Sequence, residues 1–360
     1  FAFIESPHEP GVYWAGSDDG RVHISRDGGE SWDDVSIPGS LLPDRPMISV
    51  IEPSPHDQST VYIAATRYKH DDFAPYLYKT IDDGATWTKI TNGIPDTDFT
   101  RVIREDPNRK GLLYAGTETG VYVSFDDGAN WQRFNGNLPV VPVYDLMIKG
   151  TDLLAATHGR SFWILDDLSA LHQMDTATAD QPATLFAPRV TKRIKVLGRL
   201  GDPSAETYSY GRAGGMAMTS RQRPNALGGT DVQFFDAGKN PPDGAIVHYW
   251  LKDSPSSVSL TFRDADGNAI RHFSSDGSTV EGLPAEALKV SAAEGANRFV
   301  WDLRVPGAAP ISGIDPTFTS GLNRDALIGP VVAPGSYTVD LTVDGTTYSQ
   351  PLTIEPDPAA

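Results

Sequence analysis

The chain has 360 residues, a formal net charge of −17 and no cysteine. Its 47 acidic residues against 30 basic ones argue against a nucleic-acid partner, because an acidic surface repels phosphate backbones. The lack of cysteine excludes a disulfide framework, a thiolate metal site and a cysteine nucleophile. No run of residues approaches the ~20 apolar positions that span a bilayer, so we expect no transmembrane segment. The chain begins at Phe1 rather than at a methionine, and we expect that it was processed or cut.

A short motif recurs three times in the first half of the chain. It reads Ser/Thr-x-Asp-x-Gly-x-Ser/Thr/Asn-Trp and occupies residues 25–32, 80–87 and 124–131. An apolar strand precedes each copy, and a fourth unit over residues 154–167 keeps this strand but loses the final Gly and Trp. Short strands separated by turn residues at a period of about 45 residues are typical of propeller blades.

The residue types of the motif suit a tight hairpin turn. Glycine supplies a positive φ angle, aspartate accepts N–H bonds within the turn, and tryptophan is expected to pack between blades. We therefore interpret the motif as fold-forming rather than catalytic. The residues concerned are Asp27, Gly29, Trp32, Asp82, Gly84, Trp87, Asp126, Gly128 and Trp131.

The motif resembles the Asp-box, or BNR, repeat of sialidase-like and sortilin-like propellers, and the resemblance covers residues 1–168. It implies an all-β fold with about four Asp-box β-propeller blades. Propellers of this type usually close with about six or more blades, so we expect either an open or unusual arrangement of four blades, or missing blades that belong to a longer precursor or come from a partner. The same repeat occurs in glycosidases, a sorting receptor and a photosystem II assembly factor, so the fold alone does not select a function.

The second half of the chain has a different character. We predict a linker and long irregular segment over residues 169–231, because residues 198–231 are rich in Gly, Ser, Arg and Pro without periodicity. Seven short alternating stretches then predict a two-sheet β-sandwich over residues 232–360. The phrases at 295–304 and 329–339 resemble the immunoglobulin-like sandwich of the flagellar hook-cap family, which implies that Trp301 is a core residue.

The order of propeller and sandwich resembles the C-terminal portion of exported bacterial proteins described as sortilin-like or glycosyl-hydrolase-like. This resemblance implies that the protein is exported to the periplasm or the cell exterior. Where it binds a membrane complex, we expect it to lie peripherally on that complex. It says little about chemistry.

Two segments outside the motif are candidates for binding. An insertion in the second unit combines aromatic and polar residues that the other units lack, and insertions on one propeller face often form binding surfaces. Near the end of the fourth unit, a glycine turn is flanked by polar side chains that either hydrogen-bond neighbouring blades or contact a ligand. The predicted binding residues are Tyr68, His70, Asp71, Asp72, Tyr76, His158 and Arg160.

The sequence predicts no metal site and no cofactor. The histidines lack ligand spacing, and the calcium-like stretch beginning at Asp264 has Ser275 in place of the twelfth-position Glu. Glycoside hydrolysis needs two carboxylates across one sugar, for which Asp71, Asp72 and Asp145 are the candidates outside the motif. An arginine cluster for an anionic sugar is approximated only by Arg67, Arg101 and Arg160.

Two functions are consistent with these observations. We expect a non-catalytic protein-interaction or scaffold module, such as an extrinsic subunit that stabilises a membrane-associated, for example photosynthetic, complex. The alternative is the C-terminal part of an exported carbohydrate-active enzyme, a glycoside hydrolase. Because no catalytic residue can be assigned, we expect binding rather than catalysis.

Overall fold

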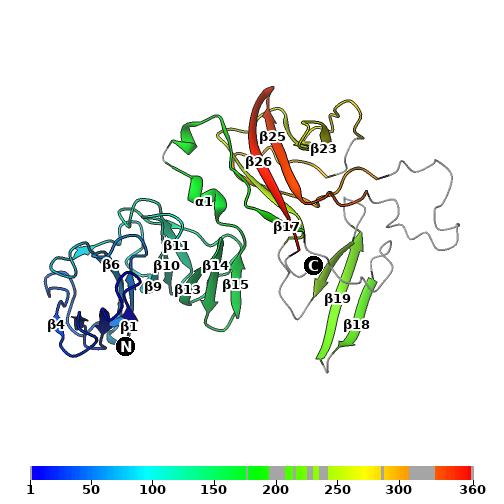
Figure 1. Cartoon of the computed structure of the whole chain (residues 1–360). Coiled ribbons are helices and arrows are strands. Elements are labelled where there is room, and N and C mark those ends of the chain that lie inside the picture. The colour runs from blue at the N-terminus through cyan, green and yellow to red at the C-terminus, as the bar shows by residue number, and fades with distance from the viewer. Residues whose placement is uncertain are drawn as a thin grey trace. The chain divides into compact units, whose positions relative to one another are not determined.

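The computed structural model describes residues 2–175, 177–193, 207–213, 216–224, 230–234, 242–284, 288–307 and 329–357 (Figure 1). The chain divides into two compact units, residues 1–168 and 169–360. Among the described residues, none of the helices has the length and apolar character needed to cross a membrane.

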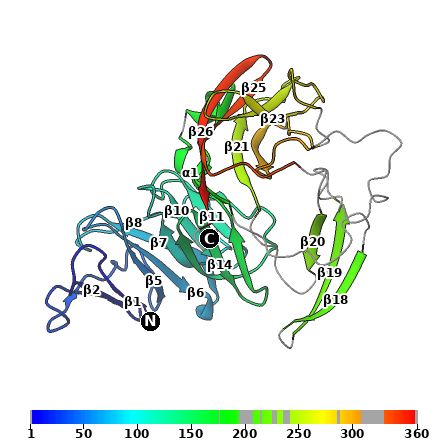
Figure 2. The same ribbon diagram turned by 45° about the vertical axis from the view of Figure 1, so that its right-hand side comes forward.

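The first unit consists of four successive antiparallel sheets, each made of strands that are consecutive in the chain (Figures 1 and 2). The first sheet contains β1 (Ala2–Glu5), β2 (Tyr13–Gly16), β3 (Val22–Ser25) and β4 (Asp33–Asp34), and the second contains β5 (Met47–Pro53), β6 (Val61–Arg67), β7 (Asp72–Thr80) and β8 (Thr88–Lys89). The third sheet contains β9 (Thr100–Glu105), β10 (Leu113–Thr117), β11 (Val121–Ser124) and β12 (Gln132–Arg133), and the fourth contains β13 (Val143–Lys149), β14 (Asp152–Thr157) and β15 (Phe162–Leu165).

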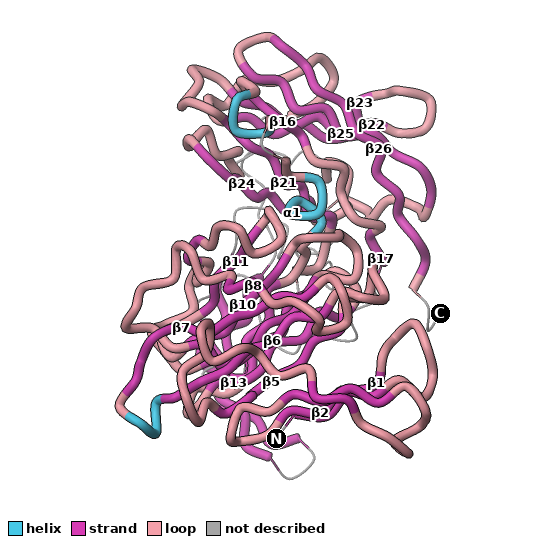
Figure 3. The backbone as a smooth tube through the Cα atoms, turned by 90° about the vertical axis from the view of Figure 1, so that its left-hand side faces the viewer, coloured by secondary structure: helices cyan, strands magenta, loops and turns pink. Residues whose placement is uncertain are grey.

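The sheets follow one another around a curve, with their first strands on the inside. Strand β1 contacts β5, β5 contacts β9, and β9 contacts β13 (Figure 3). This arrangement is an all-β, propeller-like fold, so the predicted fold class is confirmed. The first three sheets have four strands each, whereas the fourth has three among the described residues.

The second and third sheets each lie between two others, so both of their faces are covered. Successive side chains of a strand point to opposite faces, and one strand therefore contributes to both contacts. We call the side that contacts the sheet before it the preceding-side face, and the other the following-side face. In β6, Val61 and Ile63 pack against the first sheet, while Tyr62 and Ala64 pack against the third. The apolar residues therefore run without interruption along the middle strands, and two seams form from one strand.

The repeated motif folds into a closed hydrogen-bonded turn. In the second copy, the Thr80 hydroxyl donates to Asp82 Oδ1 at 2.7 Å and accepts the Gly84 N–H at 2.9 Å. Asp82 Oδ1 also accepts the Thr86 N–H at 2.8 Å. Gly84 has a φ of 86°, a conformation that side chains rarely adopt. Glycine is also required for space, since a Cβ there would lie 2.7 Å from Val35 of the first sheet.

The tryptophan that ends the motif ties its own sheet to the preceding one. Trp87 Nε1 donates to the carbonyl of Val35 at 2.9 Å, and Trp131 Nε1 donates to the carbonyl of Ile90 at 2.7 Å. Both indole rings are buried. The motif thus serves as a fastening between neighbouring sheets as well as a turn.

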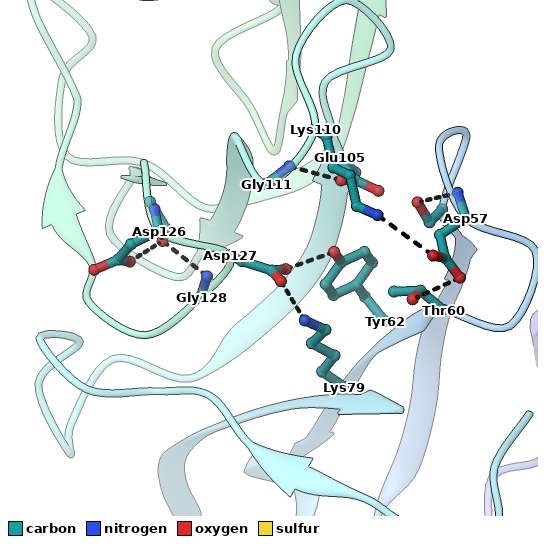
Figure 4. Close-up of polar contacts among 12 residues, drawn as sticks. Asp57, Thr60, Tyr62, Lys79, Glu105, Lys110, Gly111, Asp126, Asp127 and Gly128 are labelled. Atoms are coloured by element: carbon teal, nitrogen blue, oxygen red, sulfur yellow. Dashed lines mark hydrogen bonds and ion pairs between the residues drawn. The ribbon is translucent and has the colours of Figure 1, made fainter. Parts of the chain in front are cut away.

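A polar tie crosses the seam between the second and third sheets (Figure 4). Asp127, which has a φ of 62° in the third turn, accepts the Tyr62 hydroxyl at 2.7 Å and pairs with Lys79. Burial, and to a lesser extent the bond to Asp127, raises the pKa of Tyr62 far above its ordinary value. The phenol therefore remains a neutral donor in the seam.

In the second unit, two sheets face each other across one apolar core. Phe262 stacks on Trp301 with ring centroids 4.3 Å apart, and both rings are buried. The first sheet contains β16 (Ala183–Leu185), β21 (Ala245–Leu251) and β24 (Gly295–Trp301), and the second β17 (Thr191–Arg193), β26 (Thr346–Pro356), β25 (Gly335–Val343), β22 (Val258–Arg263) and β23 (Ala269–Ser274).

The structure corrects the predicted linker over residues 169–231. Strand β16 pairs with β21, and β17 pairs in parallel with β26, so residues 183–193 belong to the sheets of the second unit. Helices α1 (Ser169–Gln173) and η2 (Thr178–Asp180) precede them. Strand β17 falls in residues 190–196, whose sequence suggests an entering strand, whereas β16 has only three residues and shows no alternation.

A further sheet lies within the segment that we predicted to be irregular. It contains β18 (Thr207–Ala213), β19 (Met216–Pro224) and β20 (Thr230–Phe234). Strand β20 pairs with β19, so the stretch beginning at Val232 does not join the two facing sheets as predicted. Strands β18 and β19 contain many polar residues, and backbone pairing rather than apolar alternation defines them. Residues 198–206 of the predicted loop lie outside the described residues.

We predict that Trp131→Phe lowers the free energy of unfolding by ~1–3 kcal/mol, because the Ile90 carbonyl loses its buried donor. Trp32→Phe is the matched control and should change it by less than ~0.5 kcal/mol, since the Trp32 indole is partly exposed. Denaturant titration followed by circular dichroism measures both values. Equal losses in the two variants would contradict the seam as the source of the difference.

We also predict that the first unit loses stability in acid. Hydrogen bonds from the Ser31 hydroxyl and N–H lower the pKa of Asp27 to about 2. Bonds from Thr86 lower the pKa of Asp82. Burial opposes the shift at Asp126, but bonds from Asn130 still lower its pKa.

Because these carboxyls have lowered pKa values in the folded state, their contribution is present above pH ~4 and disappears as the pH falls towards ~2. Thermal unfolding measured between these pH values should therefore show a steeper loss in the wild type than in the triple variant Asp27→Asn, Asp82→Asn, Asp126→Asn. Parallel curves would refute this assignment.

Candidate functional site

The predicted insertion forms a compact corner between β6 and β7. Residues Tyr68–His70 form the short 3-10 helix η1, and Asp71 ends it in the left-handed conformation with a φ of 55°. The corner turns the Tyr68 ring towards the third sheet, where it stacks on Phe99 with ring centroids 5.1 Å apart. The insertion therefore contacts the neighbouring sheet instead of extending as a separate loop.

Arg101 lies at the centre of a group of rings. Its guanidinium carbon is 5.3 Å from the centroid of Tyr68, 4.8 Å from that of Phe99 and 4.1 Å from that of Tyr144. Such distances allow cation–π attraction, which strengthens as the cation loses water. We call the group consisting of Tyr68, Phe73, Phe99, Arg101, Tyr144 and His158 the Arg101 cluster.

Three sheets contribute to the Arg101 cluster. Tyr68 and Phe73 come from the second sheet, Phe99 and Arg101 from the beginning of β9, and Tyr144 from β13. His158, in the turn between β14 and β15, meets the Tyr144 ring edge-on at 4.9 Å. Because the first strands of neighbouring sheets lie side by side, residues at their beginnings come together although they are far apart in sequence.

A carboxylate fixes the position of the guanidinium. Glu118 Oε2 accepts two hydrogen bonds from Arg101, one from Nε at 3.0 Å and one from Nη2 at 2.6 Å. The Glu118 N–H in turn donates to the Phe99 carbonyl at 3.1 Å. Arg101 is thus held from one side by an ion pair and from the others by aromatic rings, which leaves it little rotational freedom.

Two rings of the Arg101 cluster face solvent above a buried base. Phe99 is 4% exposed, whereas Phe73 is 48% and Tyr144 46% exposed. Exposed aromatic rings next to an arginine are the residue types that contribute most binding energy at protein interfaces. The arrangement presents a preorganised aromatic surface.

Two other predicted residues form a separate polar group within the second sheet. Asp72 Oδ2 accepts the Tyr76 hydroxyl at 2.7 Å and pairs with Arg67 Nη1 at 2.6 Å. Burial of the Asp72 carboxyl acts to raise its pKa, but these bonds outweigh burial and lower the pKa of Asp72 below its ordinary value. Burial also raises the pKa of Tyr76. The ionised Asp72 braces the base of the insertion.

The remaining predicted residues take little part in the Arg101 cluster. Within the described residues, His70 and Asp71 make no side-chain hydrogen bond, ion pair or ring contact with it. The Arg160 carbonyl accepts Trp163 Nε1 at 2.9 Å, outside the cluster. Of the seven predicted binding residues, only Tyr68 and His158 belong to the Arg101 cluster.

Sequence reasoning missed Phe99, Tyr144 and Glu118 as site residues. Phe99 immediately precedes β9 and Tyr144 is the second residue of β13, outside the repeated motif and outside the insertion. The registers of β9 and β13 place Tyr144 level with Arg101 and not with Phe99, so the repeats offer no common position from which both rings could have been found. Glu118 gives no signal either, because its role depends on its distance from Arg101 alone.

Of the three carboxylates proposed for hydrolysis, Asp72 pairs with Arg67 and Asp145 with Arg104, whereas Asp71 makes no ion pair with a described residue. Arg104, on β9, pairs with Asp145 Oδ1 at 2.7 Å and with Glu52 Oε2 at 2.7 Å. Burial raises the pKa of Glu52, although the ion pair with Arg104 opposes this shift. The guanidinium lies between the two carboxylates, where a glycosidic bond would have to lie for acid and nucleophile to flank it.

A cavity of about 440 Å³ lies apart from the Arg101 cluster. It is lined by the end of β7, by β8 and by the third motif turn, including Lys79, Lys89, Asn92 and Asp127. None of the Arg101 cluster residues lines it. Its walls are those of the seam between the second and third sheets.

No protein-family model matches the chain, and no curated protein matches it. Solved structures similar to it include YCF48 bound to D1 peptide, with 14% identity over 68% of this chain and 78% of that chain and a TM-score of 0.33. YCF48 from Cyanidioschyzon merolae has 16% identity over 65% of this chain and 70% of that chain, with a TM-score of 0.35. The GH74 xyloglucanase from Xanthomonas campestris has 14% identity over 79% of this chain and 38% of that chain, with a TM-score of 0.37.

We predict that two phenylalanines of the Arg101 cluster differ in how much they contribute to the free energy of unfolding. Phe99→Ala should lower the free energy of unfolding by ~3–5 kcal/mol, because it empties a buried site beneath Tyr68 and Arg101. Phe73→Ala should change it by less than ~1 kcal/mol, because the ring is half exposed. Denaturant titration of both variants checks this division between base and surface, and a similar loss in both would contradict it.

Proposed function

We propose that the chain is a non-catalytic protein-interaction module and that the Arg101 cluster is its contact surface. The observation that carries the proposal is the pair of exposed rings, Phe73 and Tyr144, above the fixed base of Phe99 and Arg101. A rigid aromatic surface loses little conformational entropy when it binds, so more of the contact energy is available for affinity.

The alternative of a glycoside hydrolase finds less support in the residues. Hydrolysis needs one carboxyl that donates a proton and another that attacks or activates water. Arg104 engages both Glu52 and Asp145, and Arg67 engages Asp72. These carboxylates stabilise contacts between and within sheets, which is a structural role.

The finer identity of the protein is also part of the proposal. We propose an Asp-box propeller of the sortilin-like or glycosyl-hydrolase-like exported type, followed by an immunoglobulin-like sandwich. We further propose that it works in the periplasm or outside the cell as an extrinsic subunit of a membrane-associated complex, such as a photosynthetic one. The repeated motif and the order of the two units support this proposal.

Affinity purification with the intact chain tests the proposed function. We expect the wild type to retain a specific protein that the double variant Phe73→Ala, Tyr144→Ala binds at least ~10-fold more weakly. Ile81→Ala is the matched control, because this residue is also exposed but lies in the second motif turn. All three proteins should show the same circular dichroism spectrum.

Two results would overturn the proposed function. One is equal retention of partners by the wild type and the double variant. The other is hydrolysis of a glycan such as xyloglucan that is lost in Asp145→Asn, because that would make the Arg104-linked carboxylates catalytic.

A further inference from the structure

Arg104 joins the same three sheets that build the Arg101 cluster. From β9 in the third sheet, its guanidinium pairs with Glu52 of β5 in the second and with Asp145 of β13 in the fourth, at 2.7 Å each. We call these three residues the Arg104 group. The two exposed rings of the Arg101 cluster, Phe73 and Tyr144, also come from the second and fourth sheets. The Arg104 group therefore connects the two sheets whose spacing separates these rings.

The position of Tyr144 in β13 makes its ring depend on this connection. The register of β13 with β14 shifts between Val143 and Asp145, so Tyr144 is the extra residue of a β-bulge. A bulged residue is unpaired in the ladder, and its direction depends on how the residues beside it are held. Arg104 holds both residues that follow the bulge, because Nη2 pairs with Asp145 and Nε donates to the Leu146 carbonyl at 2.8 Å.

Glu52 is the buried carboxylate of the Arg104 group. Its side chain is 17% exposed, whereas that of Asp145 is 57% exposed. Glu52 faces the third sheet, as does Tyr62, which lies opposite it in β6. From β9, Arg104 attracts its charge and the buried Glu105 repels it. Two carboxylates thus share one guanidinium, and the group carries a surplus negative charge when both are ionised.

A proton relieves this surplus at Glu52. Burial of the carboxyl raises the pKa of Glu52 above its ordinary value of 4.5, although Arg104 opposes the shift. As the pH falls, Glu52 therefore takes up a proton before an ordinary glutamate does. Protonation removes the Coulomb attraction between Glu52 and Arg104 and leaves a hydrogen bond to a neutral carboxyl. The link from Arg104 to the second sheet is then weaker.

We propose that the Arg104 group is a proton-sensitive brace that fixes the spacing between Phe73 and Tyr144. This inference rests on the proposed function, because it assigns a means of regulation to the same contact surface. While Glu52 is ionised, ion pairs link Arg104 to both the second and the fourth sheet, and the two rings form one rigid surface. When Glu52 is protonated, the rings move more freely relative to each other, so binding a partner costs more conformational entropy.

Paired spin labels test whether the spacing responds to protons. The chain has no cysteine, so two engineered cysteines are its only labelling sites. His70→Cys places a label in the insertion of the second sheet, and Met147→Cys places one on β13, both at exposed positions. Electron–electron double resonance of the intact chain then measures the distribution of distances between the labels. We expect a narrow distribution at pH ~7 that broadens as the pH falls towards ~4.5.

A substitution of Glu52 imitates the protonated state. Glu52→Gln keeps the shape of the side chain and removes its charge, so the doubly labelled variant should give the broad distribution at pH ~7 as well as at ~4.5. Glu30→Gln is the matched control, because Glu30 is an exposed glutamate in the first motif turn. It should behave like the wild type at both pH values. Circular dichroism confirms that each labelled protein is folded.

Thermal unfolding gives a second readout, which moves in the opposite direction. Because the pKa of Glu52 is raised in the folded state, the folded chain binds this proton more tightly than the unfolded chain, and stability rises as the pH falls through the folded pKa towards 4.5. Glu52→Gln should therefore be more stable than the wild type at pH ~7, and the difference should shrink towards pH ~4.5. An ion pair that only stabilised the fold would make the variant less stable at pH ~7.

Three results would overturn the brace. They are a wild-type distribution that keeps its width between the two pH values, a Glu52→Gln variant with the wild-type width at pH ~7, and a Glu52→Gln variant less stable than the wild type at that pH. Neither readout uses a partner. Failure of the brace is therefore distinct from failure of the proposed function, which the retention of partners by the Phe73→Ala, Tyr144→Ala variant decides.

Discussion

The first unit depends on the packing of one sheet's following-side face against the next sheet's preceding-side face. Strand alternation makes this possible, since Tyr62 and Ile63 are neighbours in sequence and belong to different seams. The motif turns add directional contacts to this apolar packing. An indole N–H crosses the first two of the three seams to a backbone carbonyl, and in both a glycine allows the turn to approach the preceding sheet.

The candidate site is a consequence of the same arrangement. Because the first strands lie side by side on the inside of the curve, Phe99 at the start of β9 and Tyr144 in β13 come within reach of one guanidinium. The insertion between β6 and β7 then adds Tyr68 and Phe73. The second shared guanidinium, that of Arg104, uses the same proximity to link Glu52 and Asp145. One arginine thus supports the proposed binding surface, and the other neutralises carboxylates between strands.

The sequence predicts those features that depend on local pattern. The motif indicates the turns because Asp82 and its equivalents bond within a few residues of themselves, and the short apolar runs of β6 and β10 indicate buried strands. The sequence does not reveal β16, which is too short to alternate, or β18 and β19, which are polar. It finds Tyr68 and His158 but not the Arg101 cluster that joins them, because this requires knowing which strand beginnings meet in space.

The central claim is that identical motif tryptophans differ only through the sheet that precedes them. Hydrogen exchange of the indole N–H groups, followed by NMR in the intact chain, tests it most directly. The account predicts slow exchange for Trp87 and Trp131 and fast exchange for Trp32. Equal protection of all three indoles would contradict it.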